Sequence, residues 1–347
     1  ILYICTIECV IFVYDLLWSI VLYVIAKIVL LEMSESLGLI SQKGLSEVII
    51  TEIKNPIIKW FDIVLIIYAI VIGNAAYEAG NISGGVLGLE TLLGNPYLYI
   101  GTLSINYLSF VIGAVAFVLL YIGNYKVLER ALIFLVILMS LAFMVTTIIT
   151  KPSLSGIFKG TLIPKFPDDS ILTIIGLIGT TVVPYNLFLH ASLVKEKWTF
   201  KSDLKFARKD TIIAVVLGGI VSMCIIVSAA SIQSFEINNA ADLAKGLEPL
   251  FGSYATYFLA VGLFAAGITS AITAPLAAAY VACGCLGWSS NMRSRKFRGV
   301  CMFILCLGVV FSSLGIKSIE IIKFAQITNW IMLPVIGGCL LWFLNKV

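Results

Sequence analysis

Apolar segments of membrane-spanning length alternate with short polar patches along the whole chain. A helix needs about 20 apolar residues to cross the hydrocarbon core of a bilayer. The pattern predicts spans at 12–31, 61–89, 103–122, 127–149, 171–193, 210–232, 254–286, 298–316 and 322–344, and residues 1–11 resemble the end of one more. We therefore expect an all-α integral membrane protein.

Composition agrees with this pattern. The 347 residues are 60% hydrophobic and 12% charged, and the mean hydropathy is +1.06, which is far too apolar for a water-soluble domain. The chain begins at Ile1 in apolar sequence, without a charged leader or a signal-peptide pattern. We therefore expect the sequence to be truncated at its N-terminus.

Basic residues predict the orientation, because Lys and Arg concentrate in cytoplasmic loops. One basic patch covers 195–209 and a second covers 293–298, so both are expected to face the cytoplasm. By alternation the 90–101 and 233–253 loops are expected outside, where Lys245 is their one basic residue. The net charge of +4 is thus explained by topology and gives no reason to expect a nucleic-acid partner.

One span contains its own helix breaker. Residues 179–190, GTTVVPYNLFLH, place Pro184, Asn186 and the only histidine, His190, in an apolar stretch. Proline removes one helical hydrogen bond and clashes with the preceding turn, which leaves carbonyls around Thr180 without helical partners. In hydrocarbon such groups must be satisfied by protein, water or an ion. The stretch indicates either an ion site made from unwound backbone or a proline kink covered by a neighbouring helix.

A second polar group lies in VIGNAAYEAGNISGG. Asn74, Glu78 and Asn81 have helical spacing, so one helix face carries an acid between two amides. Glu78 is the only acid well inside a predicted span. A buried carboxylate must be protonated, paired or near water, so a structural role with Lys27 or a backbone donor and a role on an ion path both stay open.

The last predicted span adds two amides. FAQITNW contains Gln326 and Asn329, and an amide oxygen there could complete an oxygen-rich ion site. Each amide alone is a common interhelical hydrogen-bonding group. Together with the interrupted span they predict a polar cavity in the membrane.

The interrupted span carries a family resemblance. GTTVVPYNLFLHASLV resembles the sixth-helix signature of the NRAMP family of divalent-metal transporters, whose usual form is close to ATVMPHNLYLHSALV. YDLLWSIVLYVIAKIVLLEMSESLGLISQKGLSEVI is similar to the second helix of the family and the segment after it, and FAAGITSAITAPLAA to the eighth. Nearly the whole chain aligns in order.

The resemblance implies a LeuT-like fold of the APC superfamily, with two inverted five-helix repeats and broken first and sixth helices. Residues 1–150 would form the first repeat, from the end of helix one to helix five, and residues 151–347 the second, helices six to ten, in one transmembrane domain. The ion-binding DPGN motif of the family's first helix would then be missing from this sequence. The resemblance also implies a monomer in the plasma membrane, and the composition is typical of a prokaryote.

Three departures from the family pattern bear on the ion. Val183 aligns with the metal-binding methionine, Tyr185 with the adjacent histidine, and Ala75 with an aspartate three residues before Glu78. A thioether selects soft ions, whereas an all-oxygen site suits Mg²⁺. Losing a histidine and an aspartate removes groups that could carry a coupled proton.

These features resemble the NRAMP-related magnesium transporters, which carry Mg²⁺ and Mn²⁺ without evident proton coupling. Mg²⁺ keeps several of its waters, so the site is expected to be wide and polar. The first contacts are expected from the Thr180 carbonyl and the Asn186 and Gln326 amides, with Val183 and Tyr185 at the site. The transport path or its surroundings would include Glu78, His190, Asn74, Asn81 and Asn329.

Other functions are weighed on the same residues. A proton-coupled Mn²⁺ or Fe²⁺ transporter of the family is the first alternative, and an APC-type amino-acid transporter the second, although the latter holds its substrate with Gly-rich backbone. An enzyme would need several positioned acids, a nucleophile with its base, or a motif such as HExxH, and one histidine with one embedded acid does not supply them. A purely structural membrane protein would not need the break. No cofactor is expected beyond the ion that is carried.

Overall fold

The structure of the chain is a computed structural model. It describes residues 12, 14–52, 55–101, 103–122, 126–168, 170–181, 183–198, 200–230 and 244–314, with isolated positions between 320 and 341. In this part of the chain, helices dominate and one short hairpin is present. The predicted segment 1–11 and most of the predicted span 322–344 lie outside the described residues.

The first half of the chain contains five helices and the hairpin within the described residues. They are α2 (Leu17–Ser41), α3 (Leu45–Glu52), α4 (Pro56–Leu93), the antiparallel strands β1 (Tyr97–Ile100) and β2 (Leu103–Asn106), α5 (Tyr107–Ile122) and α6 (Lys126–Ile149).

The second half supplies two short helices and five longer ones in its described part, joined in places by single 3₁₀ turns. They are α7 (Leu154–Leu162), α8 (Ile171–Thr181), α9 (Pro184–Lys197), α10 (Leu204–Ala229), α12 (Glu248–Phe251), α13 (Ala255–Leu286) and α14 (Arg295–Ser313).

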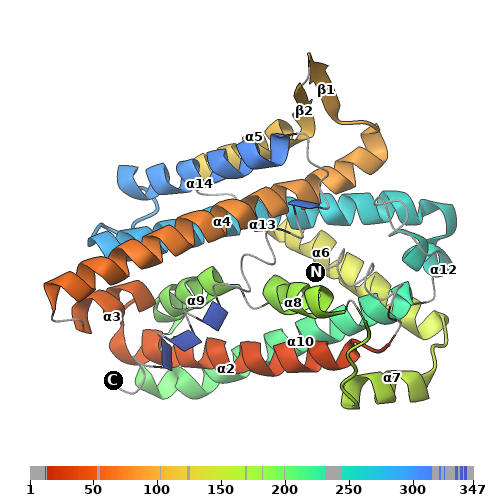
Figure 1. The fold of residues 1–347 in the computed structure, drawn as a ribbon, viewed down its shortest axis with the longest axis horizontal. Coiled ribbons are helices and arrows are strands. Elements are labelled where there is room, and N and C mark those ends of the chain that lie inside the picture. Colours follow the sequence, from red (N-terminus) through yellow and green to blue (C-terminus); the bar gives the residue numbers. More distant parts are fainter. Residues whose placement is uncertain are drawn as a thin grey trace.

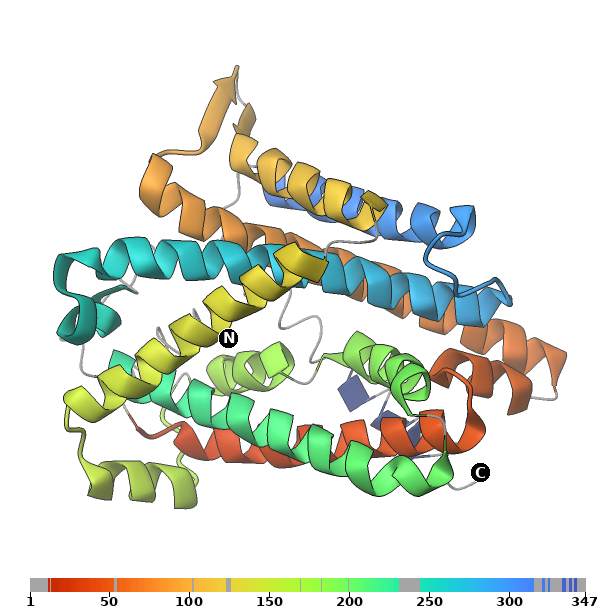
Figure 2. The same ribbon diagram turned by 180° about the vertical axis from the view of Figure 1, so that it is seen from behind.

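Helices α8 and α9 occupy the middle of the molecule. They follow one another between α2 and α10 on one side and α4 and α13 on the other (Figure 1). Helices α5 and α14 lie beyond α4 and α13, and α6 crosses the opposite face obliquely (Figure 2). Because α9 contacts both α2 and α13, the half-helix after the break is packed between these two helices.

Small residues permit a close contact between α4 and α13. A Cβ added to Gly267 of α13 would lie 2.5 Å from the Cα of Gly85 in α4, closer than real side chains approach backbone. Small residues at helix crossings let backbones come together where apolar surroundings give no hydrophobic drive. The α4–α13 contact therefore depends on this pair of glycines.

The surface agrees with a membrane environment. Five helical stretches in the described part are long and apolar enough to cross a bilayer: Leu17–Ser41, Arg130–Ile149, Lys201–Ala229, Glu248–Leu286 and Arg295–Ser313. Large apolar side chains are exposed along them and along α4, among them Trp60, Tyr68, Phe134 and Ile148. Such a surface is incompatible with water and matches lipid.

The ends of the helices agree with the predicted topology. The C-terminal ends of α9 and α13 and the N-terminal ends of α10 and α14 lie at one end of the molecule, whereas α7 and α12 lie at the other (Figure 1). The two basic patches at 195–209 and 293–298 therefore share one end, as expected for loops on the same side of a membrane.

Two predicted boundaries are wrong, and one short helix is absent from the prediction. The first span does not end at 31 but continues as α2 to Ser41, because polar side chains that resemble a loop in the sequence are bound by neighbouring helices. Residues 103–106 form β2 rather than the start of a helix, since they pair with β1 in the loop predicted at 90–101. Helix α7 was not predicted; it is short and begins at the side-chain cap of Ser153 on the Gly156 amide.

Candidate functional site

The helix break occurs where the sequence predicts it. Helix α8 ends at Thr181 and α9 begins at Pro184. Val183 between them is extended, with φ −89° and ψ 125°. The backbone N–H of Asn186 donates a 3.0 Å hydrogen bond to the Val183 carbonyl. This bond closes the first turn of α9.

The two helix ends at the break differ in charge. The last turn of α8 includes Thr180, and its carbonyl end is the negative pole of the helix dipole. On the α9 side Pro184 has no backbone N–H. The backbone N–H of Asn186 already donates to the Val183 carbonyl. The carbonyl end of α8 therefore favours a cation at the break.

The side chains beside the break are one aliphatic, one aromatic and one amide group, from Val183, Tyr185 and Asn186. Val183 and Tyr185 are buried, and Asn186 is half-buried. The Tyr185 ring packs edge-on against Tyr77 of α4, with 5.2 Å between ring centroids. This contact brings the start of α9 next to the part of α4 that carries Glu78.

The predicted polar face of α4 is present, and its two amide side chains contact α13. Asn74 Nδ2 donates to the Ala274 carbonyl at 3.4 Å, and Asn81 Nδ2 donates to the Ser270 carbonyl at 3.2 Å. These bonds confirm that the two amides share one helix face. Their present partners are backbone groups of α13, which is the interhelical role that such amides commonly have.

Glu78 is fully buried on this face. Asn81 Nδ2 lies 3.4 Å from Oε2 of Glu78. Oε1 of Glu78 has no hydrogen-bond partner among the described residues. Asn81 is thus the partner that the structure gives Glu78, whereas Lys27 lines a cavity beside α10.

His190 belongs to a cluster that joins three helices. Thr211 of α10 donates a 2.7 Å hydrogen bond to Oε2 of Glu35 in α2. His190 Nε2 of α9 lies 3.4 Å from the same oxygen and 3.3 Å from the Thr211 hydroxyl. Glu35 is completely buried, so a carboxylate, an imidazole and a hydroxyl meet one helical turn below Asn186.

A cavity of about 270 Å³ adjoins this cluster, and Lys27, Leu31, His190 and Thr211 are among its lining residues. The Oε1 atom of Glu35 is buried without a hydrogen-bond partner in the described part of the chain. The sequence prediction missed Glu35 because the span was ended at 31. The signal that could have found it is spacing, since Glu35 follows the buried Leu31 by four residues on one helix face.

Helix α2 also fixes the position of α9 through its backbone. The Ser34 hydroxyl donates to the Leu187 carbonyl, and Gly38 lies so close to the Ala191 backbone that an added Cβ would overlap the Ala191 carbonyl oxygen. The half-helix after the break is therefore held by α2 at two successive turns.

The amides of the last predicted span, Gln326 and Asn329, lie outside the described residues. Within the described part, no group of three or more His, Cys, Asp or Glu side chains is placed to hold a metal ion. The polar groups that the structure does bring to the break are the end of α8 and Asn186.

Comparison with known proteins is consistent over nearly the whole chain. Residues 10–347 match the family model described as natural resistance-associated macrophage protein-like. The chain is 25% identical over 342 residues to the divalent metal cation transporter MntH of Verminephrobacter eiseniae, covering 95% of this chain and 74% of that protein. It is 28% identical over 271 residues to MntH of Pectobacterium carotovorum, covering 76% of this chain and 63% of that protein.

A solved structure shares the fold. A crystal structure of a variant of the manganese transporter of Eremococcus coleocola superposes with a TM-score of 0.73 at 16% identity, covering 99% of this chain and 74% of that one. At this identity the similarity shows the LeuT-like architecture alone. Together with the family match, it means that the chain belongs to the NRAMP-like family of multi-pass membrane transporters of the cell membrane, which are not enzymes.

Proposed function

We propose that this chain carries divalent metal ions, Mg²⁺ and Mn²⁺, across the membrane at the break between α8 and α9, without moving a proton. The observation that carries the proposal is the interruption at Val183–Pro184, enclosed between the α2–α10 and α4–α13 pairs. The relatives described above are named as divalent metal cation transporters. Residues 1–150 and 151–347 would act as the two inverted repeats of a monomer.

The chemistry of the break favours a hard cation. Its polar groups are the carbonyl end of α8, including Thr180, and the half-buried Asn186, and the resemblance adds the amide of Gln326. Carbonyl and amide oxygens are ligands that Mg²⁺ and Mn²⁺ accept. An amino acid would instead need a cradle for its carboxylate, and the negative end of α8 disfavours one.

Val183 is the feature that admits magnesium. It is buried at the break, at the position where the family pattern has a metal-binding methionine. Without the thioether, the site has no soft ligand with which to prefer transition metals over the more abundant Mg²⁺. Selectivity would then depend on size and hydration, so a partly hydrated ion could pass.

Two buried side chains support transport without a proton. Ala75 and Tyr185 occupy the positions of the aspartate and the histidine in the family pattern, and both are buried. Neither an alanine nor a neutral phenol can carry a proton across at ordinary pH. The membrane potential alone supplies about 2.3 kcal/mol per charge per 100 mV, and twice that for a divalent ion, which is a sufficient drive for uptake.

A second candidate is proton-coupled Mn²⁺ transport, and one observation favours it. The chain keeps titratable groups near the break in the buried Glu35 and Glu78 and the half-buried His190, which a coupled transporter could use as proton carriers. The name of the Eremococcus coleocola protein mentions manganese. The two candidates differ in whether a proton crosses with the ion.

Uptake into vesicles separates them. The full-length protein is reconstituted with a pH-sensitive dye inside, and Mn²⁺ uptake is measured against increasing external Mg²⁺. Suppression of Mn²⁺ uptake by millimolar Mg²⁺ at constant internal pH is the expected result. Acidification of the lumen during Mn²⁺ entry, with a rate of Mn²⁺ uptake that does not change with external Mg²⁺, would establish the proton-coupled candidate instead.

A further inference from the structure

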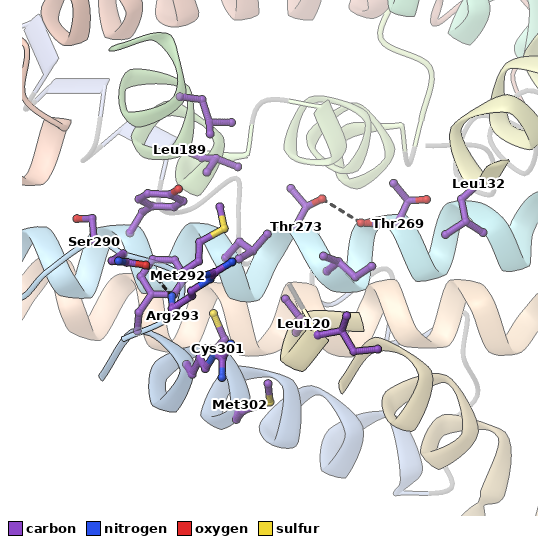
Figure 3. Close-up of a pocket in the computed structure, with 18 residues that line it drawn as sticks. Leu120, Leu132, Leu189, Thr269, Thr273, Ser290, Met292, Arg293, Cys301 and Met302 are labelled. Carbon is purple, nitrogen blue, oxygen red and sulfur yellow. Dashed lines mark hydrogen bonds between the residues drawn. The ribbon is translucent and has the colours of Figure 1, made fainter. Parts of the chain in front are cut away.

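A cavity of the described part of the chain lies away from the break, and its chemistry does not suit a metal ion. It has a volume of about 660 Å³, within the range of about 300–1,000 Å³ typical of ligand pockets. Residues of α5, α6, α9, α13 and α14 and of the loop before α14 line it (Figure 3). Asn291 and Arg293 are exposed, so the end of the cavity that they line is its mouth, and the mouth differs from the walls in polarity.

Most of the residues that line the cavity are apolar, and Thr269 and Thr273 of α13 add two hydroxyls (Figure 3). Leu120, Leu132, Leu189 and Met302 reach it from four different helices (Figure 3). Several of the helices that contribute these side chains also expose large apolar residues to the surroundings, such as Phe117 on α5. A cavity of this kind, between membrane-spanning helices, is suited to hydrocarbon.

The mouth is basic. Arg293 and Arg298 line the cavity together with the polar side chains of Ser290 and Asn291, and none of the described lining residues is acidic. Neither arginine forms an ion pair with any residue that the structure describes. The positive end of the α14 dipole, which begins at Arg295, lies at the same place.

The Arg298 side chain has a buried hydrogen-bond donor without an acceptor among the described residues. Its guanidinium carbon lies 5.1 Å from the centroid of the Tyr121 ring, which holds the side chain over an aromatic face. Its Nε is buried and has no hydrogen-bond partner within the described residues. A buried guanidinium donor without an acceptor is costly, and a phosphate oxygen is the acceptor that arginine binds best.

The location identifies the source of such a phosphate. Arg293 and Arg298 lie in the basic patch predicted to face the cytoplasm, where the leaflet carries anionic lipids. We propose that this cavity binds one anionic phospholipid of the cytoplasmic leaflet, with its phosphate on Arg293 and Arg298 and its acyl chains along the apolar wall. Basic pockets between membrane helices on this side suit lipid headgroups.

The cavity would be a poor passage for a divalent cation. Two unpaired positive charges at its mouth repel such an ion and raise the local concentration of anions. The lipid site is therefore separate from the ion site at the break, and its occupancy does not depend on which metal is carried or on proton coupling.

Lipid competition tests this inference without any transport measurement. The full-length protein in a neutral detergent is mixed with equal amounts of phosphatidylglycerol and phosphatidylcholine of the same acyl chains, and the bound lipids are counted by native mass spectrometry. The wild-type protein should prefer phosphatidylglycerol about tenfold, because hydrogen bonds to charged groups contribute factors of this size.

Two double variants with the same change in charge distinguish a built site from general attraction. Arg293→Gln with Arg298→Gln should abolish the preference. Arg295→Gln with Lys296→Gln should keep it, because neither side chain lines the cavity and Lys296 packs over the Trp288 ring. Unchanged thermal unfolding of both variants in phosphatidylcholine verifies that they fold.

Three outcomes would overturn the proposal. A wild-type preference near one means that no anionic site exists. Equal losses in the two double variants mean that the attraction is a diffuse surface effect. An unchanged lipid preference in the Arg293 and Arg298 variant means that these two arginines do not hold the headgroup.

Discussion

Replacing Thr211 by valine removes one hydroxyl from the cluster that joins α2, α9 and α10 while keeping the shape of the side chain. Thr211 is buried, and its hydroxyl donates a 2.7 Å hydrogen bond to the completely buried Glu35. The remaining neighbour of that oxygen, His190 Nε2, is 3.4 Å away. The substitution therefore deprives a buried carboxylate of its shortest hydrogen bond.

The expected cost follows from this geometry. Leaving a buried acceptor without its hydrogen bond costs about 1–3 kcal/mol, so Thr211→Val should lower the free energy of unfolding by an amount of that order. Thr211→Ser keeps the donor and loses only a methyl group, for which about 1 kcal/mol is expected. The valine variant should therefore be the less stable of the two.

Thermal inactivation of the purified full-length protein measures the difference. Because membrane proteins often unfold irreversibly, the rate of loss of monodisperse protein is compared at one fixed temperature. Thr211→Val should inactivate faster than wild type and faster than Thr211→Ser. Equal rates for valine and wild type would refute the view that this hydroxyl stabilises a buried Glu35.

Further substitutions test packing and the ion site. Gly38→Ala places a methyl group on the Ala191 carbonyl and should reduce stability by about 1–3 kcal/mol, whereas Gly84→Ala, which meets nothing within 4 Å, should be neutral in the same thermal assay. Gly308→Ala should be destabilising by a similar amount, because its methyl group would overlap the Glu78 side chain; a wild-type inactivation rate would contradict this contact. Asn186→Ala should weaken the apparent affinity for Mn²⁺ uptake about tenfold or more, as losses at metal sites commonly do, with protein yield and thermal stability unchanged; uptake at the wild-type affinity would remove Asn186 from the ion site.

The break could be predicted because its cause is local. A proline in an apolar span excludes one helical hydrogen bond wherever the chain folds, and the structure interrupts the helix at Val183, directly before Pro184. The shared face of Asn74 and Asn81 was predictable for the same reason, since helical spacing alone places them together.

Helical spacing could place Glu35 on the same face as Leu31, but the partners of Glu35 could not be located with the same rules. Its polar sequence, LEMSESLG, resembles a loop until the partners are known, and those partners lie 155 and 176 residues further along the chain. The target of Asn74 was hidden for a related reason, because a backbone carbonyl of α13 leaves no mark in the sequence. Long-range partners of buried polar groups are set by packing, which local patterns do not encode.

The short extramembrane elements were also missed. Strands β1 and β2 are four residues each, and apolar residues such as Leu103 and Ile105 extend the apolar run of α5 without a change in composition. Only the pairing with β1 distinguishes β2 from the first turn of a longer helix. Helix α7 is similarly short, and its signal is a single capping serine.

The role of Val183 in admitting Mg²⁺ is the central claim, and ion competition in a matched pair of variants tests it most directly. Val183→Met restores a thioether at the break, and Val183→Leu adds comparable bulk without sulfur. The measurement is the Mg²⁺ concentration that halves Mn²⁺ uptake into vesicles. The account predicts that it is in the millimolar range for wild type and Val183→Leu and rises about tenfold or more for Val183→Met, because a soft ligand favours Mn²⁺ over Mg²⁺. Two results would contradict this claim. One is that Mg²⁺ does not reduce Mn²⁺ uptake by the wild-type protein, and the other is that the halving Mg²⁺ concentration changes equally in Val183→Met and Val183→Leu.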